Sequence, residues 1–321
     1  MTAHGIQFPN IDPVLVHVGP FAIRWYALAY ISGFILGWLY LRYLVSNTKL
    51  WWKDGGPRIA TPLQIDDILT WTILGVLLGG RLGWALFYFI PLHTEDFLHN
   101  PLEVFYVWHG GMSFHGGLIG VILAIILFCR NQKLDIVRIG DGVACAVPFG
   151  LCFGRIANFI NGEILGKVTT VPWGVIFCNA RIKANNGGYC PAGELPRHPA
   201  QLYEAFLEGV VLFLILYALA HAFKILRRPG FATGMFLILY AAAREFVEIM
   251  YRDSDNKIGH TGWTMGEVLS IPMALIGLLF LWHAFEDRFG PMPLTKLLAR
   301  LSTYKGPPTN VPAGEPKPHQ S

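Results

Sequence analysis

A short polar cluster follows one of the most apolar stretches of the chain. Arg155, Asn158, Asn161 and Glu163 come directly after a run of Val, Ala, Phe, Leu and Gly. Arg155 and Asn158 share one face of a helix, because residues three apart are neighbours there. A guanidinium offers a planar fork of donors that fits a phosphate, and an amide adds neutral donors. Two interpretations stay open: an anion site, or an Arg–Glu pair that ties two helices together.

A second arginine stands in a similar setting further along the chain. Tyr240, Arg244, Glu248 and Tyr251 are spaced so that they form one polar stripe on one helix face. An Arg244–Glu248 pair would orient the guanidinium. The alternative is that the two side chains satisfy each other and bind no ligand. Two arginine stripes in neighbouring apolar segments favour a shared anion site over two independent struts.

The third group is a histidine in a glycine-rich setting. His115 lies between Gly110-Gly111 and Gly116-Gly117. Histidine titrates near neutral pH and is therefore the usual proton acceptor, although a lone histidine at a helix end is more often a hydrogen-bonding residue. Arg81 also lies among glycines, which indicates tight helix packing. Gln201 and Glu204 are candidates for supporting the arginine stripes.

The elements that position these residues are membrane helices. The chain has 321 residues, of which 53% are apolar and 14% charged, against about 25% charged in soluble domains. A span needs roughly 20 apolar residues. We predict an all-α polytopic membrane protein with seven transmembrane helices, and no internal repeat is visible. The predicted spans are 21–43, 66–90, 113–130, 140–161, 200–222, 231–250 and 265–285.

The basic residues predict the orientation of these spans. Fourteen Lys and Arg lie in loops 46–64, 131–139 (with flanking Arg130) and 223–230 and in the tail from 286, against six in segments 1–20, 91–112, 162–199 and 251–264. Cytoplasmic loops carry the excess of Lys and Arg, so we expect the N-terminus outside and the C-terminus in the cytoplasm. The first 20 residues also lack the basic region of a cleavable signal peptide. The net charge of +4 gives no indication of nucleic-acid binding.

Two segments outside the spans complete the organisation. We predict a membrane domain over 1–285, whose segment 162–199 is rich in Gly, Asn and Pro and forms a small, outward-facing, irregular or β-containing head. Cys178 and Cys190 lie in this head, and a disulfide and two free thiols are equally compatible with the sequence. The tail 286–321 is cytoplasmic, Pro-rich and disordered from 306.

Several kinds of chemistry find no support in the sequence. There is no Cys-x-x-Cys or other zinc spacing, no P-loop, no dinucleotide fingerprint and no Gly-x-Ser-x-Gly elbow. These absences argue against hydrolase, metalloprotease and nucleotide-driven mechanisms.

Five ordered blocks make the chain resemble the bacterial prolipoprotein diacylglyceryl transferases. The most specific block is Gly154–Glu163, and the resemblance runs from Pro20 to about Gly277. The other blocks are Gly80-Arg81-Leu-Gly83, Gly111-Met-Ser-Phe-His115-Gly-Gly, Arg197-His-Pro-Ala-Gln-Leu-Tyr203 and Tyr240 with Arg244 and Glu248.

The resemblance implies a membrane-bound enzyme of lipoprotein biogenesis in the bacterial inner membrane. It implies transfer of the diacylglyceryl group of phosphatidylglycerol to the lipobox cysteine of a prolipoprotein signal peptide, with a thioether formed and glycerol 1-phosphate released. The resemblance implies no metal and no soluble cofactor. His115, Arg155 and Arg244 are carried over as catalytic. The substrate-binding residues carried over are Tyr26, Asn158, Glu163, Tyr240 and Glu248.

The chemistry suits these residues. Charge develops on a departing phosphate, and two arginines can stabilise it. His115 is the candidate base for the thiol, unless the arginines ionise the thiol by themselves and His115 binds the headgroup. In the family an arginine usually follows the glutamate of the sixth span by three residues. Here Tyr251 takes that place and Arg252 follows one residue later, which leaves the role of Arg252 open.

Two other classes of function are alternatives to the transferase. A lipid transporter would use the arginines as a track for headgroups, and it would leave a lipobox peptide unmodified. A purely structural membrane scaffold is poorly compatible with three deep arginines, because each costs about 3 kcal/mol or more at mid-membrane.

Overall fold

The computed structural model describes residues 5–19, 21–106, 110–253, 263–290 and 293–301. The chain divides into two compact units, one of Met1–Asp54 with Gly140–Thr295 and the other of Gly55–Ile139 with Lys296–Ser321. Helices dominate both units, and the described strands are short.

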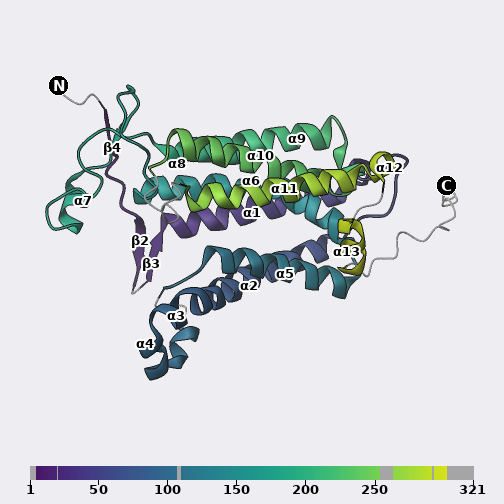
Figure 1. Cartoon of the computed structure of the whole chain (residues 1–321), viewed down its shortest axis with the longest axis horizontal. Helices are drawn as coiled ribbons and strands as arrows, with labels where there is room; N and C mark the ends of the chain where they lie inside the picture. Colours follow the sequence, from purple (N-terminus) through teal and green to yellow (C-terminus); the bar gives the residue numbers. More distant parts are fainter. Residues whose placement is uncertain (1–4, 20, 107–109, 254–262, 291–292, 302–321) are drawn as a thin grey trace, which may run out of the picture. The chain divides into compact units, whose positions relative to one another are not determined.

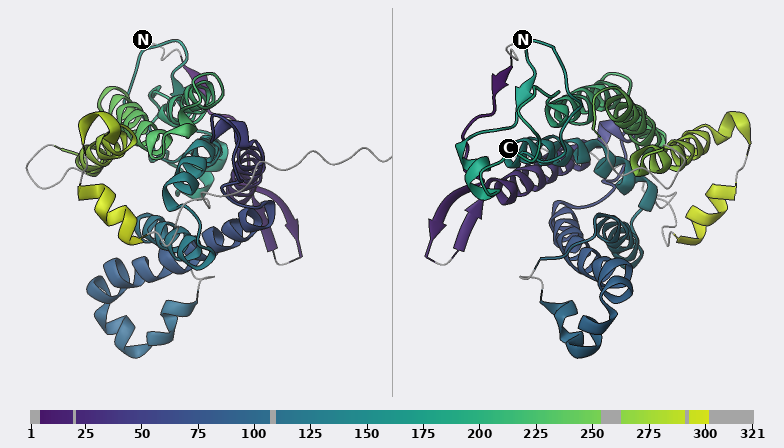
Figure 2. Two further views of the ribbon diagram at one scale, coloured as in Figure 1. Left: turned by 90° about the vertical axis from the view of Figure 1, so that its right-hand side faces the viewer. Right: turned by 60° about the vertical axis from the view of Figure 1, so that its left-hand side comes forward.

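The first unit is a helical bundle. Its long helices run side by side in both Figure 1 and Figure 2. A π-helical turn over Ala205–Val211 joins α8 to α9 without a break. These helices are α1 (Trp25–Ser46), α6 (Ile136–Asn161), α8 (Ala200–Glu204), α9 (Leu212–His221), α10 (Phe231–Met250) and α11 (Met265–Ala284).

Small residues let these helices approach closely. A Cβ on Gly33 of α1 would lie 2.8 Å from the Cα of Gly150 in α6, and a Cβ on Gly234 of α10 would lie 2.8 Å from the carbonyl oxygen of Gly277 in α11. Helix pairs in membranes use such glycines because lipid supplies no hydrophobic force between helices.

Asp141 of α6 caps the start of α10. Its fully buried carboxylate accepts hydrogen bonds from the backbone N–H of Gly230 at 2.7 Å and of Thr233 at 2.8 Å. The first N–H groups of a helix have no partner inside the helix, so a carboxylate there is stabilising. Asp141 therefore orients α10.

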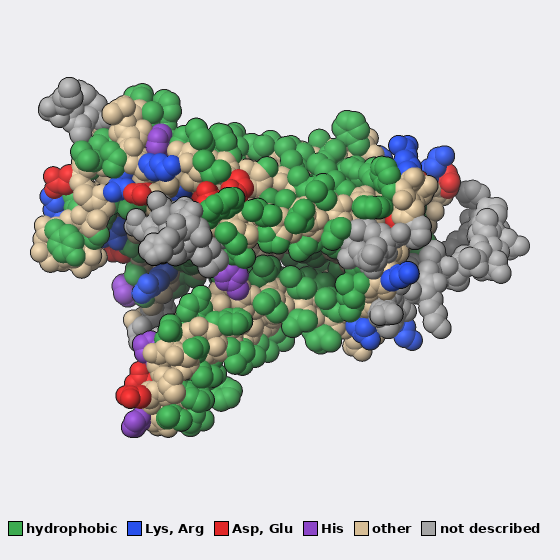
Figure 3. All heavy atoms as spheres, in the orientation of Figure 1, with side chains coloured by type: hydrophobic (Ala, Val, Ile, Leu, Met, Phe, Trp, Pro, Cys, Tyr) green, Lys and Arg blue, Asp and Glu red, His purple; other side chains and the backbone are tan. Residues whose placement is uncertain are grey.

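Within the described residues, six helical segments are long and apolar enough to cross a membrane. They cover Trp25–Ser46, Pro62–Leu92, Phe114–Gln132, Ile136–Asn161, Ala200–His221 and Gly266–Ala284. The predicted span 231–250 is also a helix, α10, and it falls outside this set because it carries Arg244, Glu245 and Glu248. In Figure 3 hydrophobic side chains cover the flanks of the bundle, and charged side chains gather mainly towards its ends. The chain is a multi-pass membrane protein.

The predicted start of the first span was wrong. Residues 21–24 form strand β3 (Phe21–Arg24), which pairs antiparallel with β2 (Val14–Val18). Gly19 has a φ of 59°, in the left-handed region that allows the chain to reverse between the two strands. Backbone pairing across this hairpin outweighs the apolar character of 21–24, so the helix begins at Trp25.

The head over 162–199 contains strand β4 (Val175–Ile176), which pairs in parallel with β1 (Ile6–Gln7). It also contains a short helix, α7 (Ala180–Asn185), that was not predicted. Its small apolar core consists of Phe8, Val175 and Phe177, and Phe159 of α6 packs against that core. The head therefore packs directly against α6, the helix that carries Arg155.

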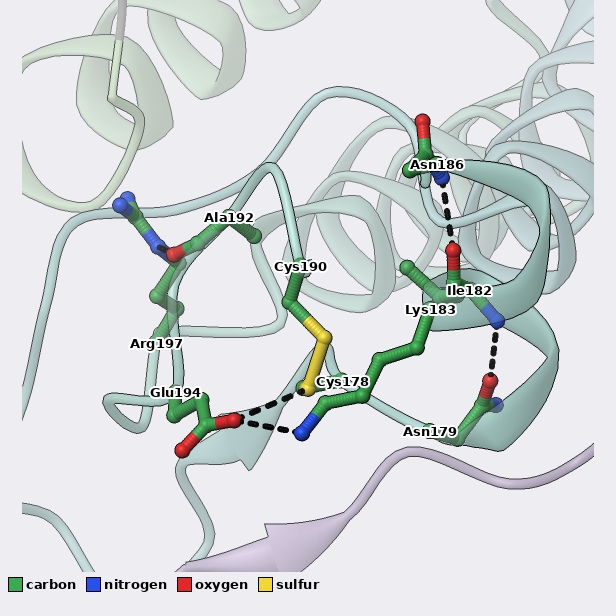
Figure 4. Close-up of a disulfide and its surroundings, with 9 residues drawn as sticks. All are labelled: Cys178, Asn179, Ile182, Lys183, Asn186, Cys190, Ala192, Glu194 and Arg197. Atoms are coloured by element: carbon green, nitrogen blue, oxygen red, sulfur yellow. Dashed lines mark hydrogen bonds and ion pairs between the residues drawn. A yellow bond between two sulfur atoms is a disulfide. The ribbon is translucent and has the colours of Figure 1, made fainter. Parts of the chain in front are cut away.

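Cys178 and Cys190 form a disulfide (Figure 4). Of the two interpretations that the sequence left open, the structure has the bonded one. Beside it, Lys183 Nζ lies 2.7 Å from Glu194 Oε1, and this hydrogen bond and charge lower the pKa of the Glu194 carboxyl. The loop between β4 and α8 is thus closed by a covalent bond and a surface ion pair.

The second unit is built on the contact between α2 (Pro62–Trp84) and α5 (Phe114–Gln132). Glycines of both helices meet along it, and a Cβ on Gly83 would lie 2.6 Å from the Cα of Gly116. The predicted tight packing around Arg81 is confirmed. The remaining short α-helices of the described residues are α3 (Ile90–Leu92), α4 (Thr94–His99), α12 (Glu286–Phe289) and α13 (Pro293–Leu301). The disorder predicted from 306 lies outside the described residues.

Candidate active site

A buried network of alternating charges occupies one region of the first unit. Three arginines and three glutamates from α6, α8, the π-helical turn, α10 and the residues directly after α10 contact one another, so their formal charges cancel. Burial of so many charges is tolerated when each is paired. The members are Arg155, Glu204, Glu208, Arg244, Glu248 and Arg252.

Arg155 is held through one edge of its guanidinium. Its Nε lies 3.1 Å from Glu208 Oε2 and 3.2 Å from Glu204 Oε2, and both carboxylates are 0% exposed. Its Nη1 and Nη2 groups donate to no acceptor in the described part of the chain. The side chain is therefore fixed in direction while its outer edge keeps donors for a ligand.

Arg244 is held by two carboxylates from different helices. Its Nη1 pairs with Glu204 Oε1, and its Nη2 lies 3.1 Å from Glu248 Oε2. The predicted Arg244–Glu248 pair is confirmed. Glu204 uses one oxygen for Arg155 and the other for Arg244, so it joins the two arginines directly. Of the two open interpretations, the structure shows the arginine–glutamate pairs between helices, and the anion site stays a prediction.

Arg252 joins the same network although it stands one residue later than the family pattern. Its Nη1 lies 3.0 Å from Glu248 Oε2 and 3.5 Å from Glu204 Oε1. Tyr251, in the place of the usual arginine, packs its ring 5.0 Å from the rings of His198 and Tyr203. Partial burial and the nearby Lys167 lower the pKa of His198. Arg252 therefore contacts Glu248 and Glu204 although it stands one residue later in the chain than the arginine of the family pattern.

The amide-rich end of α6 forms a second cluster. Glu163 accepts hydrogen bonds from Asn158 Nδ2 at 3.1 Å and from Asn161 Nδ2 at 3.0 Å. Gly162 has a φ of 74°, which lets the chain fold back so that Glu163 N–H reaches the carbonyl of Asn158. Asn158 also lies 3.4 Å from the Tyr26 hydroxyl of α1. Gln201 donates to the Glu163 carbonyl and links this cluster to α8.

Tyr240 is one turn before Arg244 on α10. Its phenol interacts electrostatically with Glu208, Arg155 and Arg244. The structure therefore brings seven of the eight predicted site residues into the first unit. They are Tyr26, Arg155, Asn158, Glu163, Tyr240, Arg244 and Glu248.

Glu208 was not predicted, and Glu204 was expected only in a supporting role. The signal was present in the sequence, since Gln201, Glu204 and Glu208 recur at helical spacing within an otherwise apolar span. Acidic residues at membrane depth are rare and face a bundle interior. A systematic count of polar spacings in every span would have found this stripe.

His115 belongs to the second unit, in the first turn of α5, and its side chain is exposed. Arg81 also lies there and takes no part in the charge network of the first unit. Among the described residues, no group of three or more His, Cys, Asp or Glu is arranged to hold a metal ion. What the first-unit site offers is fixed guanidinium and amide donors, which suit an anionic phosphate.

Comparison with known proteins agrees with this chemistry. A family model described as prolipoprotein diacylglyceryl transferase matches residues 13–283. A relative from Caulobacter sp. (strain K31) is 51% identical over 88% of this chain and 96% of its own length. Relatives from Phenylobacterium zucineum (strain HLK1) and Rhodospirillum rubrum are 50% and 48% identical over 89% and 85% of this chain, and 97% and 92% of their own lengths. All three carry the name phosphatidylglycerol–prolipoprotein diacylglyceryl transferase.

Proposed function

This chain belongs to the prolipoprotein diacylglyceryl transferase family, and we propose that it transfers the diacylglyceryl group of phosphatidylglycerol to a prolipoprotein. The acceptor is the thiol of the lipobox cysteine in the signal peptide. A C–S bond forms at the glyceryl carbon, the C–O bond to the phosphate breaks, and glycerol 1-phosphate leaves. The similarity to relatives of that name over most of the chain carries this proposal.

The arginine network supports a role in stabilising the leaving group. The carbon under attack is saturated, so negative charge builds up on the departing phosphate oxygen. The free Nη edge of Arg155 offers donors for that charge, and Arg244 supplies a second guanidinium joined to the first through Glu204. Fixed donors lower the barrier because they need no reorganisation during the reaction.

The remaining residues bind and orient the lipid in this proposal. Asn158 and Tyr26 supply neutral polar groups beside Arg155, and Glu163 holds Asn158 in place. Tyr240 and Glu248 border Arg244. We assign these five residues to substrate binding, with the reacting phosphate between α6 and α10. No cofactor enters the mechanism.

The decisive experiment measures the product. Purified protein is incubated with phosphatidylglycerol and a lipobox peptide, and the peptide mass is followed. We expect a mass increase equal to one diacylglyceryl group, and none for a peptide whose lipobox cysteine is replaced by serine. An unmodified peptide together with lipid movement between leaflets would instead identify a lipid transporter.

His115 is proposed as the base that accepts the thiol proton. His115→Gln is expected to lower the rate at neutral pH by about 10²-fold, which is typical for loss of a general base. Part of the rate should return at higher pH, because a free thiol ionises unaided near pH 8.5. The measurement is a pH–rate profile, with His99→Gln in an exposed helix as the matched control. A normal rate at neutral pH would remove His115 as the base.

We also propose seven spans in the bacterial inner membrane, with α10 as the additional span and the head outside the cytoplasm. The paired charges of α10 support this, because Arg244 and Glu248 neutralise each other. The basic loops support a C-terminus in the cytoplasm. The disulfide in the head is in keeping with an oxidising compartment.

The disulfide gives a direct test of the head's location. Cys178→Ser leaves Cys190 as a free thiol, and a membrane-impermeant maleimide is expected to label it in intact spheroplasts. The test is made in a Cys152→Ser background, because Cys152 is a partly exposed free cysteine. Protein that keeps Cys178 should then stay unlabelled until a reductant is added, since Cys129 and Cys145 are buried. Labelling that requires permeabilised membranes would place the head in the cytoplasm.

A further inference from the structure

Arg81 has an unusual set of partners for an arginine inside an apolar helix. Its guanidinium donates to four backbone carbonyls, those of Glu103, Val104, Gly110 and Gly111. The Nε bond to Val104 measures 2.8 Å and the Nη1 bond to Gly111 measures 3.0 Å. The side chain is 4% exposed, and among the described residues no carboxylate pairs with it. Arg81 therefore binds the backbone at two places, Glu103–Val104 and Gly110–Gly111.

The second of these places, Gly110–Gly111, leads directly into α5. Gly110 and Gly111 have φ values of 83° and 77°, which other residues rarely adopt. The Arg81 guanidinium also stacks 4.1 Å from the centre of the Trp84 ring, and a Cβ on Gly111 would lie 2.5 Å from that same ring. Arg81 thus binds the carbonyls of both glycines, and Trp84 of the same helix packs against Gly111.

The clamp continues to His115 through two further hydrogen bonds. Ser113 N–H donates to the carbonyl of Gly80 at 2.9 Å, next to Arg81 in the chain. The Ser113 hydroxyl then accepts the N–H of Gly116 at 3.2 Å and caps α5. His115 stands inside that cap, and the bond from Ser113 N–H to the Gly80 carbonyl ties the start of α5 to α2.

We propose that Arg81 is a positioning residue for His115. It fixes the backbone at Gly110 and Gly111 and thereby sets the direction of the imidazole at the start of α5. The inference rests on the proposed function only in that His115 accepts the thiol proton. A displaced base loses rate steeply, by up to about 10²-fold for a shift of 1 Å.

The kinetic test is a double-mutant comparison. Arg81→Gln is expected to lower kcat for diacylglyceryl transfer about 10- to 100-fold with little change in KM for phosphatidylglycerol. Arg81→Lys should restore little, because one ammonium cannot reach four carbonyls. In a His115→Gln background, Arg81→Gln should cost less than about twofold, since the base it positions is already gone. Equal losses in both backgrounds would overturn the proposal.

A spectroscopic readout keeps the test independent of activity. The ¹⁵N-histidine signal of His115, identified by its loss in His115→Gln, is expected to shift in Arg81→Gln. It should stay unchanged in Arg42→Gln, a matched control that removes another arginine stacked on a tryptophan, Trp38. An unmoved His115 signal in folded Arg81→Gln overturns the inference, whatever the transferase assay reports.

A second variant covers the case in which Arg81→Gln does not fold. Gly110→Ala leaves Arg81 in place and meets no atom within 4 Å, but it strains the left-handed backbone at an acceptor carbonyl. It is expected to shift the His115 signal and lower kcat in the same direction. A folded Gly110→Ala protein with normal kcat and an unmoved signal would contradict the proposal.

Discussion

Arg155→Ala is expected to lower the rate of diacylglyceryl transfer by about 10³-fold. Removal of a single fixed donor to a developing negative charge typically costs about 10²- to 10³-fold, and Arg155 offers two free Nη groups. The measurement is the initial rate of the mass increase of a lipobox peptide in the presence of phosphatidylglycerol. Binding of phosphatidylglycerol should weaken as well, because the ground-state phosphate already carries a charge.

The controls for Arg155 separate charge from geometry. Arg155→Lys keeps the charge but lacks the planar fork, so it should recover only a small part of the rate. Arg42→Gln removes an arginine at the opposite end of α1 from Tyr26 and should leave the rate unchanged. Folding must be checked, since the substitution leaves Glu208 with Arg244 as its remaining cationic partner, at 4.0 Å. Full activity in a folded Arg155→Ala protein would refute the phosphate-binding role.

Glu204→Ala is expected to abolish transfer and to destabilise the bundle. Glu204 is 0% exposed and pairs with three arginines, so its loss leaves buried positive charges facing one another. Removal of one partner from a buried ion pair costs about 3–5 kcal/mol. We expect a clearly lower midpoint of thermal unfolding in detergent, together with loss of activity.

Two matched variants, Glu204→Gln and Glu245→Gln, serve as comparisons for Glu204→Ala. Glu204→Gln keeps the volume and one acceptor, so it should restore part of the stability while activity remains low. Glu245→Gln removes a carboxylate next to Arg244 in the chain that forms no ion pair among the described residues, and it should be far milder. A Glu204→Ala protein with unchanged stability and normal transfer would show that the two arginines are positioned independently.

Local patterns in the sequence were enough to predict most helices. The predicted span 231–250 coincides with α10, and 265–285 differs from α11 by one residue. The error at residues 21–24 arose because hydropathy does not distinguish an apolar strand from the first turn of an apolar helix. Pairing with β2 in the adjacent hairpin, which hydropathy does not register, decided that segment.

Residue type and spacing also identified most of the site. Arg155 and Arg244 stood out because arginine is costly at membrane depth, and the Arg244–Glu248 pair followed from helical periodicity. The partners of Arg155 could not be deduced in this way, since Glu204 and Glu208 lie on another helix. Asp141 illustrates the same limit, because it caps α10 from α6.

The sequence by itself determined the membrane class, the helices and the arginine stripes, because hydropathy and helical spacing depend on residues close together in the chain. Only the tertiary structure decided which charges meet. It joins Arg155 to Arg244 through Glu204, brings in Arg252 despite its shifted position, and binds Arg81 to backbone carbonyls of a loop. Such contacts depend on how helices pack and rotate against one another, and that packing is set by small residues spread over the whole chain.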